Sequence, residues 1–339
     1  MDNHGAIADG RLVDRFGRPH THVRVSVTDR CNLRCFYCMP AGGVVFRPHE
    51  SILSFEEIAR FVQVVAGMGI RKVRLTGGEP LVRKGVDSLV RMLARIPGIE
   101  DLALTTNGIL LPEQAEGLKK AGLKRLNISL DTLDRERFRQ ISRRDGLDQV
   151  LAGIASALEV GFEQIKLNAI AVRNLSEPDI VPLAKFARAR GLELRFIEFM
   201  PLGGDGTWEH GRVLGAAEIL EILAGAFGPV EPIPARDGTA PATRYRFLHA
   251  GGPPVGIIAS VTEPFCTSCG RLRLTSEGLV KNCLFSAEEH NAKAILRRGG
   301  SDEQLAALVV AAVRGKKKQH GTDDGAFAIS PRAMNQIGG

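Results

Sequence analysis

Short β-rich runs alternate with helical stretches along the first two thirds of the chain. The run Val23–Thr28 shows the pattern well, because apolar and polar residues alternate along it, as in a strand with one buried face. Six strands are predicted, at Val23–Thr28, Lys72–Gly77, Asp101–Thr105, Lys124–Leu130, Gln164–Ala171 and Glu193–Phe199. Six β–α units in a row predict right-handed crossovers and a parallel sheet.

The helices between these strands begin and end at recognisable residues. Ser54-Phe55-Glu56-Glu57 is a capping box and predicts a helix that ends near Gly67. Further helices are predicted at Val82–Ile96, Glu113–Ala121, Leu147–Val160 and Ser176–Arg190. A glycine follows each of them within two residues and is free to take the left-handed conformation that closes a helix.

An open doubly wound sheet and a partial barrel both satisfy this alternation. The position of the unusual residues favours the barrel, because they gather where strands end. They are Cys31–Cys38, Gly77-Gly78-Glu79-Pro80, Thr105-Thr106-Asn107-Gly108, Ser129-Leu130-Asp131, Lys166 and Asn168, and Glu198, Met200 and Pro201. The carboxyl ends of the strands are the face on which α/β barrels build active sites. The predicted fold class is therefore α/β, a partial (β/α)6 barrel of the TIM type.

The pattern changes after Pro201. A glycine-rich loop at Gly203–Gly206 is followed by predicted elements that mix helices and strands. These are a helix at Ala216–Phe227, strands at Thr243–His249 and Val255–Val261, a hairpin from Arg271 to Gly278, and an apolar helix at Asp302–Arg314. The chain is expected to divide into an N-terminal extension (1–20), the barrel (21–202) and a C-terminal α+β subdomain (203–339).

Composition and charge narrow the class of protein. The 339 residues are 44% hydrophobic and 24% charged, an ordinary composition for a soluble protein. Met1–Gly10 lacks the apolar core of a signal peptide, and no apolar run approaches the roughly 18 residues of a membrane helix. A cytoplasmic location without membrane association is expected, in which disulfides are rare. The net charge of +7 fits a polyanionic small molecule or RNA, or solubility alone.

Three cysteines lie close together directly after the first predicted strand. Cys31, Cys35 and Cys38 have the spacing C-x3-C-x2-C, and no second Cys or His pair of a zinc finger follows nearby. Three thiolates on a four-iron cube leave one iron open for chemistry. This spacing, with an aromatic residue at Tyr37, resembles the radical S-adenosylmethionine (SAM) enzymes. Zinc binding, a disulfide and chance are the alternatives.

The other three cysteines form a second triad, Cys266, Cys269 and Cys283. Two open iron–sulfur clusters, or one such cluster and one zinc ion, are the chemical options. A zinc ion would need a fourth donor, for which His249 and His290 are the nearest candidates. His20 and His22, before the first strand, are interpreted as surface or structural histidines, although a ligand role is conceivable. Lys316-Lys317-Lys318 is interpreted as a solvated run.

Beyond the cysteines, the motifs resemble those of the GTP 3′,8-cyclases of molybdenum cofactor biosynthesis. The resemblance is carried by Thr28–Pro40, Arg74–Leu81, the second triad with Gly270–Arg273, and the closing Gly338-Gly339, and it extends from about Gly17 to the last residue. It implies two 4Fe–4S clusters, the second of them in the C-terminal subdomain. It also implies SAM-dependent radical cyclisation of GTP to (8S)-3′,8-cyclo-7,8-dihydroguanosine 5′-triphosphate. That reaction needs no acid–base pair of side chains, and none is recognisable in the sequence.

The resemblance also implies site residues. The expected SAM contacts are Tyr37, Gly78, Ser129 and Met200, and the expected GTP contacts are Arg24, Arg74, Thr105, Lys166, Arg271, Leu272 and Arg273. A triphosphate needs several cations, among which arginine suits forked recognition. Gly338 and Gly339 resemble a tail that reaches the active site. Each residue also has an ordinary alternative, such as a core, turn or solvated position.

Two other functions are compatible with parts of the sequence. One is a radical SAM enzyme that modifies a peptide or RNA, and the other is a zinc-stabilised RNA-binding module. The 5% aromatic content and the scattered basic residues disfavour nucleic-acid binding. The expected partners are GTP, an external one-electron donor and, downstream, cyclic pyranopterin monophosphate synthase. A homodimer is among the assemblies compatible with the sequence.

Overall fold

The computed structural model describes residues 7–8, 10–40, 42, 44–202, 208–235, 238–320 and 332–338. Its centre is a run of six parallel strands that are neighbours in chain order. They are β3 (His22–Ser26), β4 (Lys72–Thr76), β5 (Asp101–Thr106), β6 (Arg125–Ser129), β7 (Gln164–Ala171) and β8 (Glu193–Glu198). All six predicted strands are confirmed to within two residues at either end.

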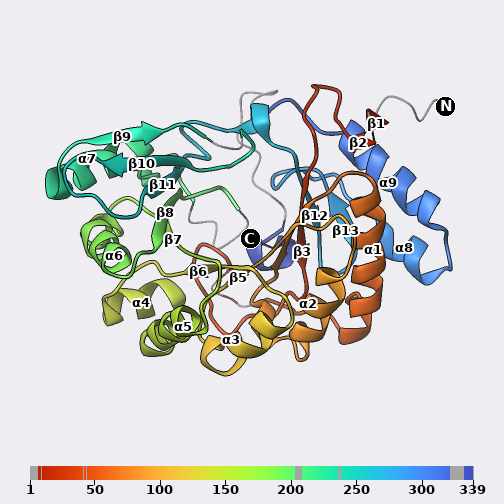
Figure 1. The fold of residues 1–339 in the computed structure, drawn as a ribbon, viewed down its shortest axis with the longest axis horizontal. Coiled ribbons are helices and arrows are strands. Elements are labelled where there is room, and N and C mark those ends of the chain that lie inside the picture. The colour runs from red at the N-terminus through yellow and green to blue at the C-terminus, as the bar shows by residue number, and fades with distance from the viewer. Residues whose placement is uncertain are drawn as a thin grey trace.

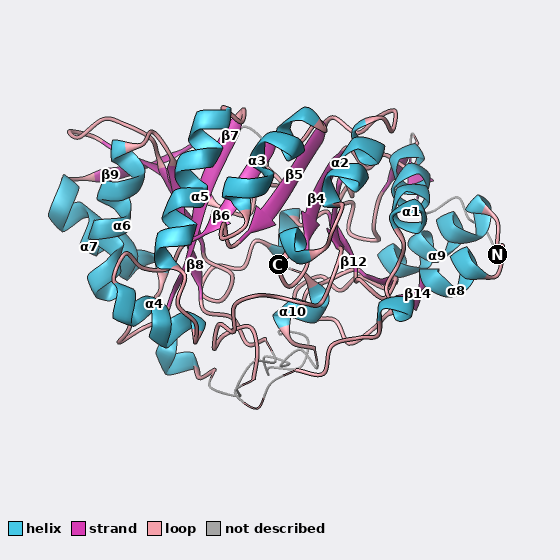
Figure 2. Cartoon of the chain, turned by 90° about the horizontal axis from the view of Figure 1, so that it is seen from below, coloured by secondary structure: helices cyan, strands magenta, loops and turns pink. Residues whose placement is uncertain are grey.

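Helices cover the outer side of this sheet, which follows an arc rather than a closed ring (Figures 1 and 2). They are α1 (Phe55–Gly67), α2 (Val86–Ala94), α3 (Leu111–Lys120), α4 (Arg135–Ser142), α5 (Leu147–Val160) and α6 (Glu177–Ala189). The capping box at α1 is confirmed, since Ser54 Oγ accepts from the Glu57 amide and the Glu57 carboxylate from the Ser54 amide. Helix α4 was not predicted. Among the described residues, every helix is too short or too polar to span a bilayer.

Strands from the C-terminal part of the chain complete the sheet at both ends. On one side β11 (Val255–Ile258) pairs in parallel with β8, and on the other β12 (Arg271–Leu274) pairs in parallel with β3. The remaining elements are β9 (Val230–Ile233), β10 (Thr243–Phe247), β13 (Leu279–Lys281), β14 (His290–Asn291), α7 (Ala216–Phe227), α8 (Ala292–Arg297), α9 (Asp302–Arg314) and α10 (Met334–Ile337), and β1 (Ile7–Ala8) pairs with β2 (Arg11–Leu12) apart from the main sheet. The partial barrel with a C-terminal α+β part is therefore confirmed, while the three-part division remains a prediction.

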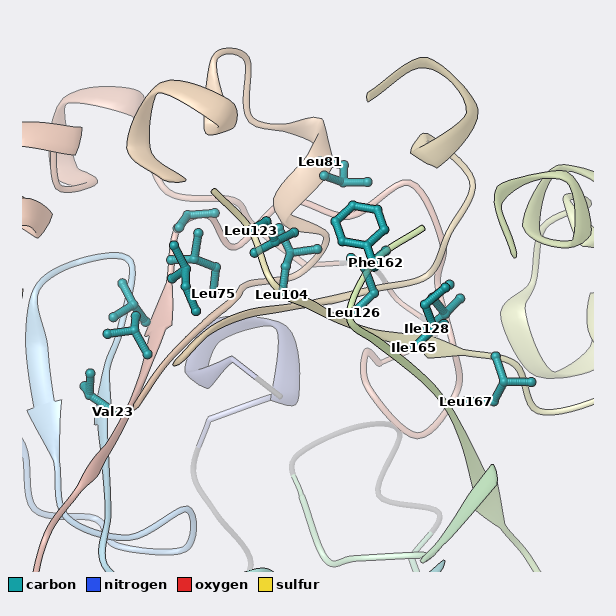
Figure 3. Packing of buried hydrophobic residues seen from close by; sticks show 14 of the residues in the cluster. Val23, Leu75, Leu81, Leu104, Leu123, Leu126, Ile128, Phe162, Ile165 and Leu167 are labelled. Carbon is teal, nitrogen blue, oxygen red and sulfur yellow. The ribbon is translucent and has the colours of Figure 1, made fainter. Parts of the chain in front are cut away.

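Residue alternation gives the central strands two different faces. Val23 and Val25 on β3 and Val73 and Leu75 on β4 are almost fully buried in the layer between sheet and helices, part of which Figure 3 shows. The polar residues between them, such as Arg24, belong to the opposite face. That face lines the inside of the arc. The alternation of apolar and polar residues therefore directs cationic side chains toward the inside.

Candidate active site

A cavity of about 550 Å³ lies inside the arc, at the carboxyl ends of the central strands. Its walls come from strands β3 to β8, from the loops after β3, β4, β5, β6 and β8, and from the C-terminal part of the chain. All six cysteines line it, and all six are free thiols. The two triads, which are more than two hundred residues apart in the sequence, thus face a single chamber.

The loop that carries the first triad is fixed by backbone hydrogen bonds. The amides of Cys38 and Met39 both donate to the Cys35 carbonyl, at 2.9 and 3.0 Å. The neighbouring loop crosses it closely, since the Gly78 amide donates to the Thr28 carbonyl at 2.7 Å. A Cβ atom on Gly78 would lie 2.4 Å from the Arg30 carbonyl oxygen. Glycine at this position is therefore required for the two loops to meet.

The first triad is half-buried and lies beside acidic groups. Burial, with a further contribution from Glu79, raises the pKa of Cys31 to about 11. Burial likewise raises the pKa of Cys35 and Cys38, and the charge of Asp131 adds to the effect. The Leu33 amide donates to Cys31 Sγ at 3.4 Å, a type of contact that stabilises cluster-bound thiolates. Three thiols from one loop, one already hydrogen-bonded at sulfur, fit an iron–sulfur cluster.

Two carboxylates orient the groups around this triad. Glu79 accepts hydrogen bonds from the Leu81 and Asn107 amides and the Thr106 hydroxyl, at 2.7–3.0 Å. Asp131 accepts from the Tyr37 hydroxyl at 2.5 Å and so fixes that ring at the cavity wall. Burial raises the pKa of Glu79 to about 7 and that of Asp131 to about 6. This half of the chamber is thus acidic and depends on buried hydrogen bonds.

The second triad has the opposite electrostatic surroundings. Arg271 Nε donates to Cys269 Sγ at 3.4 Å, and Lys316 Nζ lies 3.8 Å from the same sulfur. Although burial alone raises it, the pKa of Cys269 is lowered to about 6 by these two cations, with Arg271 the stronger. A thiolate is therefore favoured at Cys269, which fits a metal-bound sulfur. The Lys316–Lys318 prediction is wrong for Lys316, which is only 3% exposed.

The histidine that approaches the second triad is neither of the two candidates from the sequence. His249 and His290 are not among the described residues that line the cavity. His320 lines it instead, with Nδ1 2.8 Å from Cys266 Sγ. In the described part of the chain, no three His, Cys, Asp or Glu side chains are close enough together to hold one metal ion. His20, for its part, is structural, being 1% exposed and 3.4 Å from Asp14.

Most of the predicted SAM and GTP contacts lie on the cavity wall. Those that line it are Tyr37, Gly78, Ser129, Met200, Arg24, Arg74, Thr105, Arg271 and Arg273. Ser129, at the end of β6, stands beside Asn168 of β7, which also lines the cavity. The structure thus brings these residues together. Whether each of them contacts a ligand remains a prediction.

Three arginines, of which Arg273 is buried and Arg24 and Arg74 are half-buried, form a row across neighbouring strands. Arg24 on β3 is the register partner of Arg273 on β12 and of Arg74 on β4. Burial lowers the pKa of all three, to about 10 for Arg273 and about 9 for Arg74, and nearby arginines lower each further. Within the part of the chain that the structure describes, neither Arg24 nor Arg74 has an ion pair. Charges held away from water without a counter-ion are costly, which makes an anion-binding role for this row a prediction.

Two predicted GTP contacts lie elsewhere. The side chain of Leu272 is 0% exposed in the hydrophobic core, because alternation along β12 turns it away from Arg271 and Arg273, so only its backbone could meet a ligand. Lys166 is not among the described residues of the cavity wall, and its Nζ lies 3.5 Å from Glu193. Burial, which is the largest influence, lowers its pKa to about 8.

The C-terminal segment reaches the chamber. Arg273 donates to the Gly338 carbonyl, and a Cβ on Gly338 would lie 2.4 Å from Thr76 Oγ1 at the end of β4. Met334 and Asn335 line the cavity. Gly339, the other predicted tail residue, and the loop Gly203–Gly206 lie outside the described residues.

Sequence reasoning missed several residues of the chamber. Arg195 lines it from β8, and the alternation of Leu194, Arg195 and Phe196 would have revealed it. Arg18 also lines it, but no local pattern marks that residue. The same holds for His320, whose partner Cys266 is distant in the sequence.

Comparisons with known proteins agree with this geometry. Residues 25–187 match the radical SAM superfamily, and residues 192–322 match the family described as Molybdenum Cofactor Synthesis C. The chain is 49% identical to the GTP 3′,8-cyclase of Rhodopirellula baltica, with 97% of this chain and 92% of that protein covered. It is 46% identical to the GTP 3′,8-cyclase of Pelotomaculum thermopropionicum, with 97% and 100% covered.

Solved structures support the fold alone. Streptococcus suis SuiB bound to precursor peptide SuiA superposes with a TM-score of 0.64 at 15% identity, over 94% of this chain and 71% of that one. Two family matches that follow each other along the chain, together with relatives of nearly equal length, lead to one assignment. The chain belongs to the GTP 3′,8-cyclase family of the radical SAM superfamily.

Proposed function

We propose that this chain converts GTP to (8S)-3′,8-cyclo-7,8-dihydroguanosine 5′-triphosphate, the first step of molybdenum cofactor biosynthesis. The observation that carries the proposal is the shared chamber, in which both cysteine triads and a row of arginines, two of them without an ion pair among the described residues, face one cavity. A triphosphate supplies the anion that the arginines lack, and the acidic half of the chamber leaves room for a cationic sulfonium. The names of the relatives agree.

Two 4Fe–4S clusters and SAM are the cofactors of this proposal. Cys31, Cys35 and Cys38 would hold the first cluster. Cys266, Cys269 and Cys283 would hold the second. When bound, the first cluster and SAM would supply the radical chemistry that removes a hydrogen atom from C3′ of GTP and allows C3′ to bond to C8 of guanine. Because hydrogen-atom abstraction needs no side-chain base, the chain's own contribution is binding and orientation.

The residues of the acidic half would position SAM. The loop Gly78–Glu79 offers its backbone to the SAM ammonium, because its glycines allow it to lie against the triad loop. Ser129 would hold the SAM ribose from the end of β6, with Met200 beside the adenosyl group. Tyr37 is kept in place by Asp131.

The residues of the cationic half would bind GTP. Arg24, Arg74 and Arg273 form the row that takes the triphosphate, since forked guanidinium groups suit phosphate oxygens. Arg271 stands between the second triad and this row, and Thr105 adds a hydroxyl from β5. Lys166 would join the site by exchanging its partner Glu193 for phosphate. The hydrogen bond from Arg273 to the Gly338 carbonyl supports a position of the C-terminal tail beside the substrate.

The proposal includes two further partners, an electron donor and a downstream enzyme. The reaction would consume two electrons from an external one-electron donor, one for the reductive cleavage of SAM and one, with a proton, for the nucleotide radical left when C3′ bonds to C8. Its product would pass to cyclic pyranopterin monophosphate synthase. A zinc ion at the second triad is the alternative. Analysis of the metal content of the purified protein distinguishes it from an iron–sulfur cluster.

The experiment is an anaerobic assay of the reconstituted protein with dithionite, SAM and GTP, followed by mass spectrometry of the nucleotides. We expect 5′-deoxyadenosine and the cyclised nucleotide in step with each other, and iron and sulfide for two clusters. Formation of 5′-deoxyadenosine without cyclised nucleotide would instead favour a radical SAM enzyme with a peptide or RNA substrate. A colourless protein with zinc only would contradict the proposal altogether.

A further inference from the structure

A short segment after helix α9, Lys316–His320, forms part of the wall beside the second triad. Its three lysines differ sharply in environment. Lys317 and Lys318 are exposed, whereas Lys316 is buried. Its Nζ donates to the Arg271 carbonyl at 3.1 Å and lies 3.8 Å from Cys269 Sγ. A buried ammonium group is costly to place, so its position against the sulfur calls for an explanation.

The other end of the segment meets a different sulfur. His320 Nδ1 lies 2.8 Å from Cys266 Sγ, and Nε2 lies 3.1 Å from the Ser260 carbonyl oxygen. The imidazole ring stacks on Phe285, with ring centroids 4.5 Å apart. Because Ser260 and Phe285 fix the ring on two sides, its remaining nitrogen is directed at Cys266.

One buried arginine ties this segment to the cysteine loop. Arg18 Nη1 donates to the carbonyls of Cys266 and Lys318, at 2.8 and 2.9 Å, and Nη2 donates to that of Lys317 at 2.8 Å. Its Nε donates to Asp14 at 2.5 Å, and the residue is only 5% exposed. A single guanidinium group thus holds the triad loop and the Lys316–His320 segment at a fixed separation.

We propose that Lys316 and His320 are positioning residues of the second cysteine triad, each holding one sulfur, and that Arg18 fixes their segment in place. The inference rests on the proposed function in one respect, namely that this triad binds an iron–sulfur cluster. Net charge and hydrogen bonds to the sulfurs set the reduction potential of such clusters. A buried positive charge stabilises the reduced cluster, which carries one more electron. Lys316 therefore raises the potential, and the exposed Lys318 does so far less because water and salt screen it.

The test uses full-length protein in which Cys31, Cys35 and Cys38 are alanine, so that only the second cluster assembles and no turnover is needed. Its midpoint potential is measured by a dithionite titration followed by electron paramagnetic resonance. Lys316→Gln keeps a donor for the Arg271 carbonyl but removes the charge, and we expect a clearly more negative potential. Lys318→Gln makes the same charge change in an exposed residue and should leave the potential near the parent value.

A second measurement addresses His320 and Arg18 independently of the potential. Iron release to a chelator, followed by the loss of visible absorbance, should be several-fold faster in His320→Ala and in Arg18→Lys than in the parent. Arg298→Lys, an exposed change of the same type, is the control for Arg18→Lys. If Lys316→Gln lowers the yield of folded protein, iron release from the folded fraction of that variant, compared with the parent, tests the role of Lys316.

The outcomes separate the two proposals. A parent protein that binds no cluster at the second triad overturns the cluster assignment and with it this inference. A parent that binds the cluster, with equal potentials in Lys316→Gln and Lys318→Gln and unchanged iron release in His320→Ala, overturns this inference and leaves the proposed function intact.

Discussion

Arg273 and Arg24 stand opposite each other in register on two adjacent parallel strands, β12 and β3, although they come from opposite ends of the chain. Arg74 on β4 continues the row on the other side of Arg24. Neighbouring strands are about 4.8 Å apart, so the backbone positions that carry the three arginines follow one another closely. The positive charges of such a row repel one another unless an anion neutralises them.

Arg273→Ala should weaken GTP binding while sparing the fold. The loss of one charge-assisted contact costs about 1.5–3 kcal/mol, roughly a ten- to hundredfold rise in Kd. The thermal stability of the free protein should stay unchanged or increase, because a buried repulsive charge has been removed. Calorimetric titration with GTP measures the first effect, and a melting curve measures the second. Arg298→Ala is the matched exposed control, and equal affinities in the two variants would remove Arg273 from the substrate site.

Substitutions in the two cysteine triads should have different effects on the reaction. Cys35→Ala should abolish SAM cleavage, since that thiol belongs to the loop beside Gly78 and Tyr37. Cys269→Ala should lose the cyclised nucleotide but still form some 5′-deoxyadenosine, because its triad lies in the cationic half. Chromatographic measurement of 5′-deoxyadenosine and nucleotide distinguishes these cases. Retained SAM cleavage in Cys35→Ala would contradict the assignment of the first triad.

Gly270→Ala should destabilise the protein, because a Cβ there would lie 1.9 Å from the Pro19 carbonyl oxygen. Forcing these backbones apart costs about 1–3 kcal/mol in the free energy of unfolding. Gly225→Ala in helix α7 meets no atom within 4 Å and should stabilise the protein by about 0.5–1 kcal/mol. Urea unfolding of the three proteins provides the test. A Gly270→Ala variant as stable as wild type would show that the N-terminal segment and the second triad's loop do not pack so closely.

The pH dependence of the free energy of unfolding should reveal the raised pKa of Asp131. Burial raises its pKa from 3.8 to about 6 in the folded protein. Between these values the folded state holds a proton that the unfolded state has lost, so the carboxyl group's contribution to stability is full below about pH 4 and is lost as the pH rises through 6. The stability difference between wild type and Asp131→Asn, measured by urea unfolding of cluster-free protein, should fall over this interval and level off above pH 7. A constant difference would mean that Asp131 titrates normally.

Local sequence patterns predicted the elements but not their long-range pairing. The capping box of Ser54 and Glu57 and the identical bounds of α5 and α7 follow from neighbouring residues alone. The pairing of β12 with β3 is different, since it depends on contacts between distant segments that no local pattern encodes. Helix α4 was missed because half of its residues are charged and it lacks a long apolar face.

The site residues follow the same division. The six cysteines were recognisable from spacing, and the inward arginines from alternation. Leu272 differs from its neighbours Arg271 and Arg273 because the strand turns its side chain into the core, so its predicted GTP contact could involve only its backbone. Lys316 was taken for a solvated residue because its neighbours are lysines, yet only the folded chain shows it against Cys269. His320 and Arg18 depend wholly on tertiary contacts.

The completion of the sheet by β11 and β12 has a consequence for synthesis on the ribosome. Until those two strands emerge, β3 and β8 present bare backbone amides and carbonyls along both margins of the growing half-barrel. Such margins readily recruit other extended chains. Premature termination before Arg271 should therefore yield an aggregation-prone fragment without enzymatic activity. During that interval, the nascent polypeptide exposes surfaces that chaperones bind.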